Sequence, residues 1–109
     1  MHELSIAQFV VEACAERAEG GRILRVTLEI GKLAAVMPDA LRFCFDVCAR
    51  HTPLEGAALD IVELPGRAIC RDCHCVVMLD DLLARCTCGS CNVEIVGGEE
   101  LKVKEMEVA

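Results

Sequence analysis

The sequence predicts an α+β fold: a small three-stranded sheet with two helices, plus an inserted cysteine-rich lobe. Three observations lead to this prediction. Apolar residues recur at helical spacing in two segments and alternate in three others. Six of the nine cysteines fall between residues 70 and 91. At 109 residues, the chain has the size of one domain, or of one domain that carries a small metal-stapled lobe.

Two segments are predicted to be helices. The first spans residues 3–19 and ends at Gly20-Gly21, because glycine readily terminates a helix. The second begins at Pro38, since proline is tolerated in the first helical turn, and it ends before the segment 51–56. The expected inward stripes are Leu4, Ala7, Val11, Cys14 and Ala18 in the first helix and Leu41, Cys44, Phe45 and Cys48 in the second.

Three segments are predicted to be strands. Residues 22–30 alternate between apolar and polar, and residues 57–64 form a second strand. In the third, residues 100–108, the apolar positions change from odd to even, so a β-bulge is expected near Lys104–Glu105. Residues 31–36 are interpreted as a connection. The inward face expected for the first strand consists of Leu24, Val26, Leu28 and Ile30.

The cysteine-rich segment is predicted to be inserted between two strands of one sheet. The LPG segment at 64–66 is expected to be a hinge, and Gly97-Gly98 closes the lobe. The predicted organisation is therefore an α/β domain formed by residues 1–66 and 97–109, and a lobe formed by residues 67–96.

Composition and charge exclude several classes of protein. The formal net charge is −7, and there is neither Trp nor Tyr, so a nucleic-acid-binding surface is not expected. The N-terminal segment lacks the pattern of a signal peptide, and no apolar run is long enough to span a membrane. An odd number of cysteines without a secretion signal indicates a reducing, cytoplasmic environment and metal ligands rather than disulfides.

The paired cysteines predict a structural zinc site, which makes the insertion a zinc-ribbon-like lobe. Zinc accepts four thiolates in a tetrahedron, and such a closed site leaves no position for a catalytic water. A lobe of this size buries too little apolar area to fold alone, so the metal would supply its folding free energy. Cys70 and Cys73 form the first pair of ligands.

The second pair of ligands has two candidates. Cys88 and Cys91 have the usual two-residue gap, whereas Cys86 and Cys88 are one residue closer. Gly89 favours the tighter pair, because a glycine after the second cysteine lets the backbone turn with positive φ. The spacing therefore favours Cys88 and Cys91 as ligands, whereas the expected turn at Gly89 favours Cys86 and Cys88. Cys75 and the cysteine left over are interpreted as spare thiols, and His74 as a solvated residue of the turn.

The N-terminal residues Met1, His2 and Glu3 offer a free α-amine, backbone amide nitrogens and an imidazole. These nitrogens can form fused chelate rings in one plane, an arrangement that Ni(II) and Cu(II) prefer. All of these groups must lose protons before the metal binds, so binding would depend on pH.

Three segments occur together in this sequence: MHELS (1–5), LEIGKLAAVMPDALRFCFD (28–46) and GGEELKVKEMEV (97–108). The CxxC lobe precedes the last of them. The set resembles the HypA family of nickel metallochaperones in [NiFe]-hydrogenase maturation. The resemblance implies a nickel site at Met1, His2 and Glu3, formed by the amine, the imidazole and the backbone. Residues 1–66 and 97–109 would be the nickel-binding domain, and residues 67–96 the zinc-binding lobe.

The resemblance also implies the zinc ligands and the partners. The family's second CxxC is followed by Gly-Ser, which here follows Cys88, while Arg85 stands where the preceding cysteine would be. Cys86 is the natural substitute, so the implied ligands are Cys70, Cys73, Cys86 and Cys88. The implied partners are a HypB-type GTPase and the hydrogenase large subunit, with urease nickel-handling proteins as a variant.

A binding protein that carries Ni(II) as cargo and zinc as a structural ion is therefore expected, and not an enzyme, because the sequence offers no catalytic array. The alternative is a zinc-ribbon adaptor protein without nickel delivery. A basic patch is not visible in residues 70–91, which argues against a nucleic-acid adaptor. A thiol redox protein that uses CxxC is the third hypothesis, and one tightly bound zinc per chain would exclude it.

Overall fold

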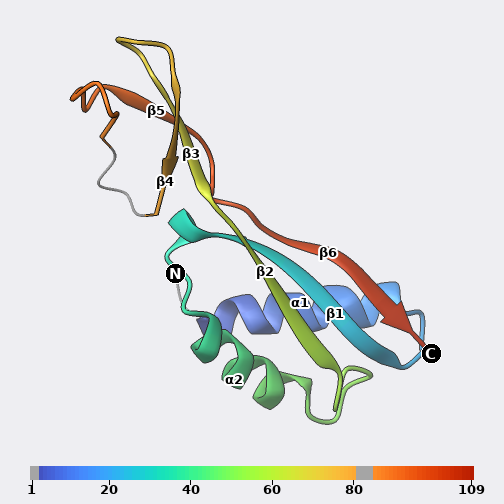
Figure 1. The fold of residues 1–109 in the computed structure, drawn as a ribbon. Helices are drawn as coiled ribbons and strands as arrows, with labels where there is room; N and C mark the ends of the chain where they lie inside the picture. The colour runs from blue at the N-terminus through green and yellow to red at the C-terminus, as the bar shows by residue number, and fades with distance from the viewer. Residues whose placement is uncertain (1–2, 81–84) are drawn as a thin grey trace. The chain divides into compact units, whose positions relative to one another are not determined.

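The structure, a computed structural model, describes residues 3–80 and 85–109. It confirms the predicted α+β fold class and adds a second sheet (Figure 1). No helix in the described part of the chain is both long and apolar enough to cross a membrane. In chain order the elements are α1 (Glu3–Arg17), β1 (Ile23–Gly31), the 3-10 helix η1 (Lys32–Ala34), α2 (Pro38–Ala49), β2 (Ala58–Leu64), β3 (Gly66–Cys70), β4 (Val76–Leu79), β5 (Val93–Gly97) and β6 (Leu101–Val108).

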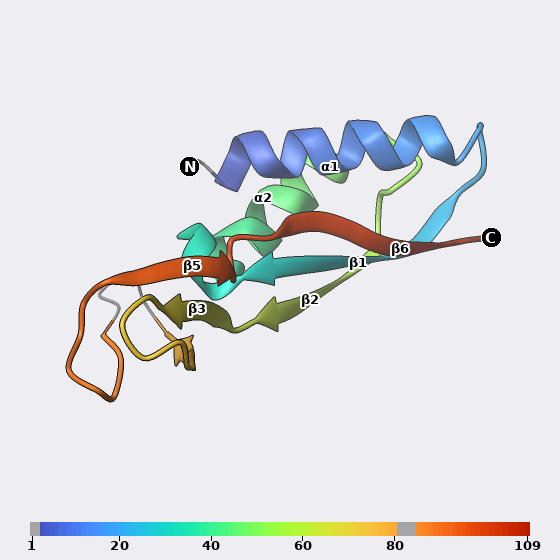
Figure 2. The same ribbon diagram turned by 90° about the horizontal axis from the view of Figure 1, so that it is seen from above.

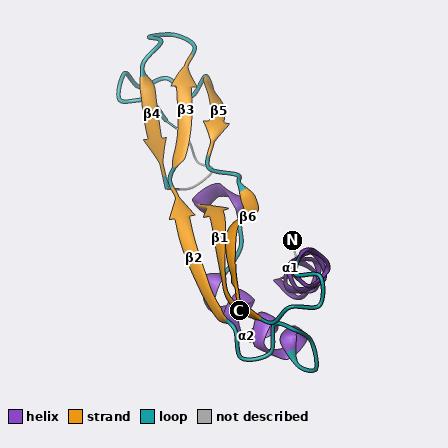
Figure 3. Cartoon of the chain, turned by 90° about the vertical axis from the view of Figure 1, so that its right-hand side faces the viewer, coloured by secondary structure: helices purple, strands orange, loops and turns teal. Residues whose placement is uncertain are grey.

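The chain divides into two compact units. The helical unit contains the residues up to Glu29, Ala35–Val62 and Lys102–Ala109. The cysteine unit contains Ile30–Ala34 and Glu63–Leu101. One sheet has the strand order β2-β1-β6, and the other has the order β4-β3-β5. In the first sheet β2 runs parallel to β1 and β6 runs antiparallel to it, so this sheet is mixed (Figures 2 and 3).

Both helices cover the same face of the first sheet, and they pack against each other (Figures 2 and 3). Because α1 contacts both α2 and the sheet, it buries a face that differs from the expected stripe. Ala7, Val11 and Cys14 are buried as predicted, but Leu4 was wrongly placed inside, since it is 48% exposed. Ile6 and Val10 are buried in addition.

Helix α2 begins at Pro38, and its buried residues are Leu41, Phe45 and Ala49. The residue before it, Met37, is extended, which is the conformation that a following proline favours. Cys44 and Cys48, which were predicted to be in the inward stripe, are only half-buried. Burial raises the pKa of the Cys48 thiol above its ordinary value.

The central strand β1 has three of its four predicted inward residues in the core: Val26, Leu28 and Ile30. Leu24 is 45% exposed, and its neighbour Ile23 is buried instead. The N–H of Ile23 donates to the carbonyl of Pro53, so the strand begins against the segment after α2. In β6, residues 104 and 105 are both exposed between half-buried Val103 and Met106, which matches the predicted change of phase.

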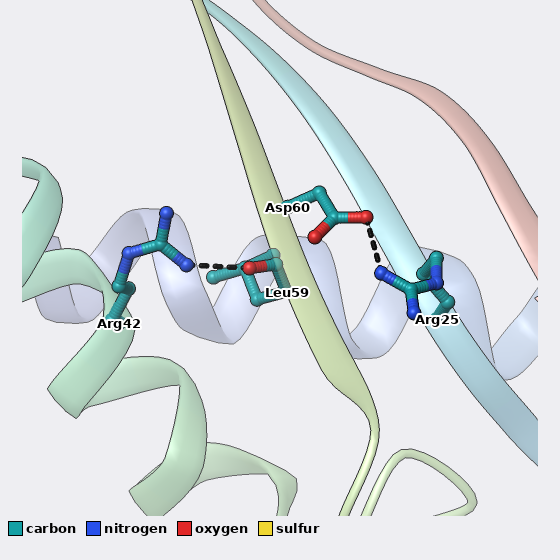
Figure 4. Close-up of polar contacts among 4 residues, drawn as sticks. All are labelled: Arg25, Arg42, Leu59 and Asp60. Carbon is teal, nitrogen blue, oxygen red and sulfur yellow. Dashed lines mark hydrogen bonds and ion pairs between the residues drawn. The ribbon is translucent and has the colours of Figure 1, made fainter.

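Two arginines hold β2 to its neighbours in the helical unit (Figure 4). Arg42 of α2 donates to the carbonyl of Leu59 at 2.5 Å, and Arg25 of β1 pairs with Asp60 at 2.6 Å. Both partners of the second pair are about half exposed, so water screens the pair and it contributes little to stability.

The cysteine unit has a second sheet that the sequence analysis did not predict. Strand β3 lies in its centre and pairs antiparallel with β4 and with β5, so that Ala68 lies opposite both Val77 and Ile95. Leu33 of η1 is buried against Ala68 and Leu79. Residues 31–36, interpreted as a connection, therefore supply a core residue to this unit.

Glycines let three backbone segments of the cysteine unit come into contact. A Cβ on Gly31 would lie 1.9 Å from the carbonyl oxygen of Gly98, and a Cβ on Gly98 would lie 2.4 Å from the Cα of Gly66. Real Cβ atoms do not approach other atoms so closely. Only glycine therefore fits at the point where these segments meet.

Candidate metal centre

Four thiols converge in the cysteine unit. The sulfurs of Cys70, Cys73, Cys86 and Cys88 all lie within 4.8 Å of one another. Cys70 and Cys88 are 3.7 Å apart, and Cys73 and Cys86 are 3.4 Å apart. Zinc binds thiolates at about 2.3 Å, so the edges of a tetrahedral site are about 3.8 Å. The donor set therefore fits zinc in both chemistry and spacing.

Two turns with the same pattern of hydrogen bonds present these thiols. In the first turn, the N–H of His74 donates to the carbonyl of Cys70, and the N–H of Cys70 donates to the carbonyl of Cys75. In the second, the N–H of Gly89 donates to the carbonyl of Cys86, whose own N–H donates to the carbonyl of Ser90. The second turn is thus the first turn with one residue fewer between its cysteines.

The residue after the second cysteine has positive φ in both turns. Gly89 has φ of +93°, as its role in the turn requires, and His74 has φ of +63°. From its sequence context alone, His74 is interpreted only as a solvated residue of the turn. Its position after Cys73, equivalent to that of Gly89 after Cys88, was the signal that could have revealed its conformation.

The first cysteine of each turn is the better thiolate. The backbone N–H of Cys73 donates to the Cys70 sulfur and lowers the pKa of Cys70 to about 6. The N–H of Cys88 does the same for Cys86 and lowers the pKa of that thiol. For Cys73, the backbone of Cys75 favours the thiolate, but the neighbouring sulfurs of Cys86 and Cys70 outweigh it and raise the pKa.

One contact between the two turns was missed by sequence reasoning. The Ser90 hydroxyl donates to the carboxylate of Asp72, and it accepts the N–H of Asn92 at 3.0 Å. The side chain of Arg71 donates to the side-chain oxygen of Asn92 at 3.2 Å. Asp72 lies between Cys70 and Cys73, and Ser90 lies two residues after Cys88, so their hydrogen bond connects the two halves of the candidate site.

The other cysteines lie outside this group. Cys91 and Cys75 are exposed, and neither belongs to the group of four convergent thiols. None of the nine cysteines forms a disulfide. The structure therefore brings Cys86 and not Cys91 to Cys70 and Cys73, as the turn at Gly89 favoured.

A pair of serine variants tests which cysteine holds the metal. We expect Cys86→Ser to lower zinc retention sharply against a competing chelator, because it removes one of four soft ligands. Cys91→Ser is the matched control and should retain zinc as the unmodified chain does. The measurement is zinc per chain at increasing chelator concentration. The reverse order of retention would assign the fourth ligand to Cys91.

The predicted nickel site lies mostly outside the described residues, because Met1 and His2 are not among them. Glu3 begins α1, and its carboxylate accepts the N–H of Met37 at 3.3 Å. The start of α1 and the start of α2 are therefore joined within the helical unit.

The fold and the four-thiol site together define a class: a small α+β metal-binding protein whose cysteines can fill the coordination sphere of a structural ion. The model of one protein family matches residues 1–108, and its description is "Hydrogenase/urease nickel incorporation, metallochaperone, hypA". The chain belongs to this HypA family, so it is a nickel metallochaperone and not an enzyme.

Similar proteins agree with this assignment over the whole chain. The hydrogenase maturation factor HypA of Trichormus variabilis is 52% identical over 108 residues, which cover 99% of this chain and 96% of that protein. The factor of the same name from Geobacter metallireducens is 50% identical over 109 residues, with 99% of both chains covered. The solution structure of the Ni metallochaperone HypA from Helicobacter pylori has a TM-score of 0.68 at 29% identity, and 99% of this chain and 97% of that chain are covered.

Proposed function

We propose that this chain binds Ni(II) through the α-amine of Met1, the imidazole of His2 and the backbone nitrogens of His2 and Glu3. The match of the nickel-incorporation family to residues 1–108 carries the proposal, because that match includes the N-terminus. Amine, amide and imidazole nitrogens at the start of one chain can surround a tetragonal metal ion without help from the rest of the fold.

The proposed ligands of a structural zinc ion are the thiolates of Cys70, Cys73, Cys86 and Cys88. When bound, it supplies structural cross-linking between the two turns, and the thiolates leave no open position. The proposed division places nickel binding in residues 1–66 and 97–109 and zinc binding in residues 67–96. The two compact units support such a division, except that residues 30–34, 63–66 and 97–101 belong to the cysteine unit.

Delivery is proposed to occur in the cytoplasm to the large subunit of a [NiFe]-hydrogenase, together with a HypB-type GTPase. Urease nickel-handling proteins are a second proposed set of partners, because the family description names both hydrogenase and urease. The net charge of −7 supports protein partners rather than nucleic acid.

The nickel site is tested by changes at the chain terminus that leave the fold unchanged. One extra residue before Met1 should abolish tight binding, because it replaces the chelating amine with an ordinary amide. His2→Ala should have the same effect, while zinc remains bound because the two sites share no residue. Calorimetric nickel titration near neutral pH is the measurement, with intact mass confirming each N-terminus.

The matched control for these titrations is His51→Ala, which removes an exposed imidazole far along the sequence. This variant should bind nickel as the unmodified chain does. If the extended chain bound one nickel ion with unchanged affinity, the N-terminal site would be refuted.

A further inference from the structure

A chain of polar contacts beside the four convergent thiols joins the two cysteine turns. The Ser90 hydroxyl donates to the carboxylate of Asp72 and accepts the N–H of Asn92 at 3.0 Å. The carbonyl of Asn92 accepts the N–H of Arg71 at 2.9 Å, and its side-chain oxygen accepts the Arg71 guanidinium at 3.2 Å. We call these four residues the polar clasp: Arg71, Asp72, Ser90 and Asn92. Its side-chain bonds between the turns join residues that are 18 and 21 positions apart in the sequence.

The two turns differ in how the second sheet holds them. The first turn connects two paired strands, β3 and β4, so the sheet holds both of its ends. For the second turn, the structure describes such an attachment only at the end that leads to β5. Its own hydrogen bonds, which join Cys86 to Gly89 and to Ser90, stay inside the turn. Among the described residues, the polar contacts that attach the second turn to the first are those of the thiols and of the polar clasp.

The attachment of a turn affects how easily a four-thiolate site loses its metal. Such a site releases its ion one bond at a time, and each freed thiolate either returns or is replaced by a competing ligand. A turn that is still held close to the metal keeps its thiolate at a high effective concentration, so return is favoured. Cys86 and Cys88 are the ligands in the second turn, so their return depends on the polar clasp.

We propose that Asp72 and Ser90 are positioning residues of the zinc site: their hydrogen bond holds the second turn against the first and thereby slows the release of zinc. The inference rests on the proposed binding of zinc by the four cysteines. The Ser90 side chain is suited to this role because it is half-buried, and because the N–H of Asn92 occupies its oxygen and leaves its proton for Asp72.

An effect of charge alone would have the opposite sign. Four thiolates around a divalent cation leave a net negative charge, which a neighbouring carboxylate repels. Removing the charge of Asp72 should therefore strengthen zinc retention, whereas removing its hydrogen bond should weaken it. Asp72→Ala removes both. Asp72→Asn removes the charge alone, since its amide oxygen can still accept the Ser90 hydroxyl.

The test measures zinc release from the zinc-loaded chain into excess pyridylazoresorcinol, a coloured chelator. Ser90→Ala and Asp72→Ala should each release zinc about 3- to 10-fold faster than the unmodified chain, which is the range that one hydrogen bond corresponds to. Ser90→Thr keeps the hydroxyl and should release zinc at nearly the unmodified rate, and Asp72→Asn should release it no faster. Asp80→Ala is the matched control, because this carboxylate of the same unit is 91% exposed and pairs with Lys32 outside the polar clasp.

Two readouts separate positioning from a general loss of stability. The chain that carries both Asp72→Ala and Ser90→Ala should release zinc no faster than either single variant, because all three lack the same hydrogen bond. The β3 amides of zinc-loaded Ser90→Ala should keep their protection against hydrogen exchange, because the second sheet does not depend on this bond. Additive acceleration, or loss of β3 protection, would indicate a general loosening of the unit and overturn the proposal.

Release rates and zinc content together show which idea fails. Unmodified release rates in Ser90→Ala and Asp72→Ala, with one zinc per chain, would overturn the positioning role and leave the zinc site standing. Slower release from Asp72→Ala would show that charge outweighs the hydrogen bond, and it would also overturn the proposal. An unmodified chain that takes up no zinc would refute the proposed zinc binding, and the role in its retention with it.

Discussion

Replacing Cys70 with alanine is expected to remove zinc from the purified chain and to unfold the cysteine unit, while α1 and α2 remain helical. Cys70 is buried at the end of β3, and the hydrogen bond from the N–H of Cys73 lowers the pKa of its thiol to about 6. Structural zinc contributes about 10–16 kcal/mol to the folding of small metal-dependent domains. Apolar burial in the unit cannot replace that contribution, because its cluster of buried residues is small: Leu33, Ala68 and Leu79, with the partly buried Val77, Val93 and Ile95 packed against them.

Zinc content and hydrogen exchange measure the two parts of this expectation. Amides of β3 and β5 should lose protection in Cys70→Ala, whereas those of α1 and α2 should keep it. Cys75→Ser is the control, because Cys75 lies near the site but outside the group of four thiols. Full zinc content together with protected β3 amides in Cys70→Ala would refute a structural role for the metal.

Replacing Gly31 with alanine is expected to lower the free energy of unfolding by about 3 kcal/mol or more, and the Tm by roughly 12–20 °C. The new Cβ would lie 1.9 Å from the carbonyl oxygen of Gly98. Neither side can move away easily. The N–H of Gly31 donates to the carbonyl of Glu100, and the N–H of Leu33 donates to the carbonyl of Gly98, both at 2.7 Å.

Gly20→Ala is the control that separates two causes of lost stability: lack of space for a Cβ and a backbone with positive φ. Gly20 has φ of +86°, but nothing lies within 4 Å of its position for a Cβ. Its replacement should therefore cost only about 1–2 kcal/mol. Thermal unfolding of both variants decides the matter, and an equal loss of stability in the two would show that the contact between Gly31 and Gly98 is not decisive.

The sequence predicts both helices well because their start and stop signals are local. Pro38 marks the observed start of α2, and the predicted end of the first helix is within two residues of Arg17. The inward face of α1 could not be predicted in full. A single amphipathic stripe describes a helix with one neighbour, whereas α1 packs against α2 and also covers a face of the first sheet (Figures 2 and 3).

The second sheet was not predictable from local patterns. Strand β4 has only four residues, and both β3 and β5 adjoin the cysteine turns, whose composition conceals the alternation of a strand. The role of Leu33 was hidden for a different reason. It packs against Ala68, which is far away in the sequence, and the pairing of the two follows from the fold alone.

The candidate zinc site was largely predictable, because its chemistry and turns are encoded locally. Gly89 indicated that Cys88 closes the second turn, and the structure brings Cys86 to Cys70 and Cys73. The bond between Ser90 and Asp72 was not predictable, since it joins the two turns only after both have formed. Binding of zinc at the four cysteines and of nickel at Met1, His2 and Glu3 stays a prediction.

The strand order determines which unit of the chain can fold first during synthesis on the ribosome. Every residue of the cysteine unit precedes Lys102, whereas β1 lies in the middle of its sheet and needs β6 as a neighbour. All four convergent thiols therefore leave the ribosome before the sheet of the helical unit can be completed. Until β6 arrives, β1 has one unpaired edge that can associate with other chains. If zinc binds before β6 emerges, the cysteine unit is already folded when the last strand becomes available to pair with β1.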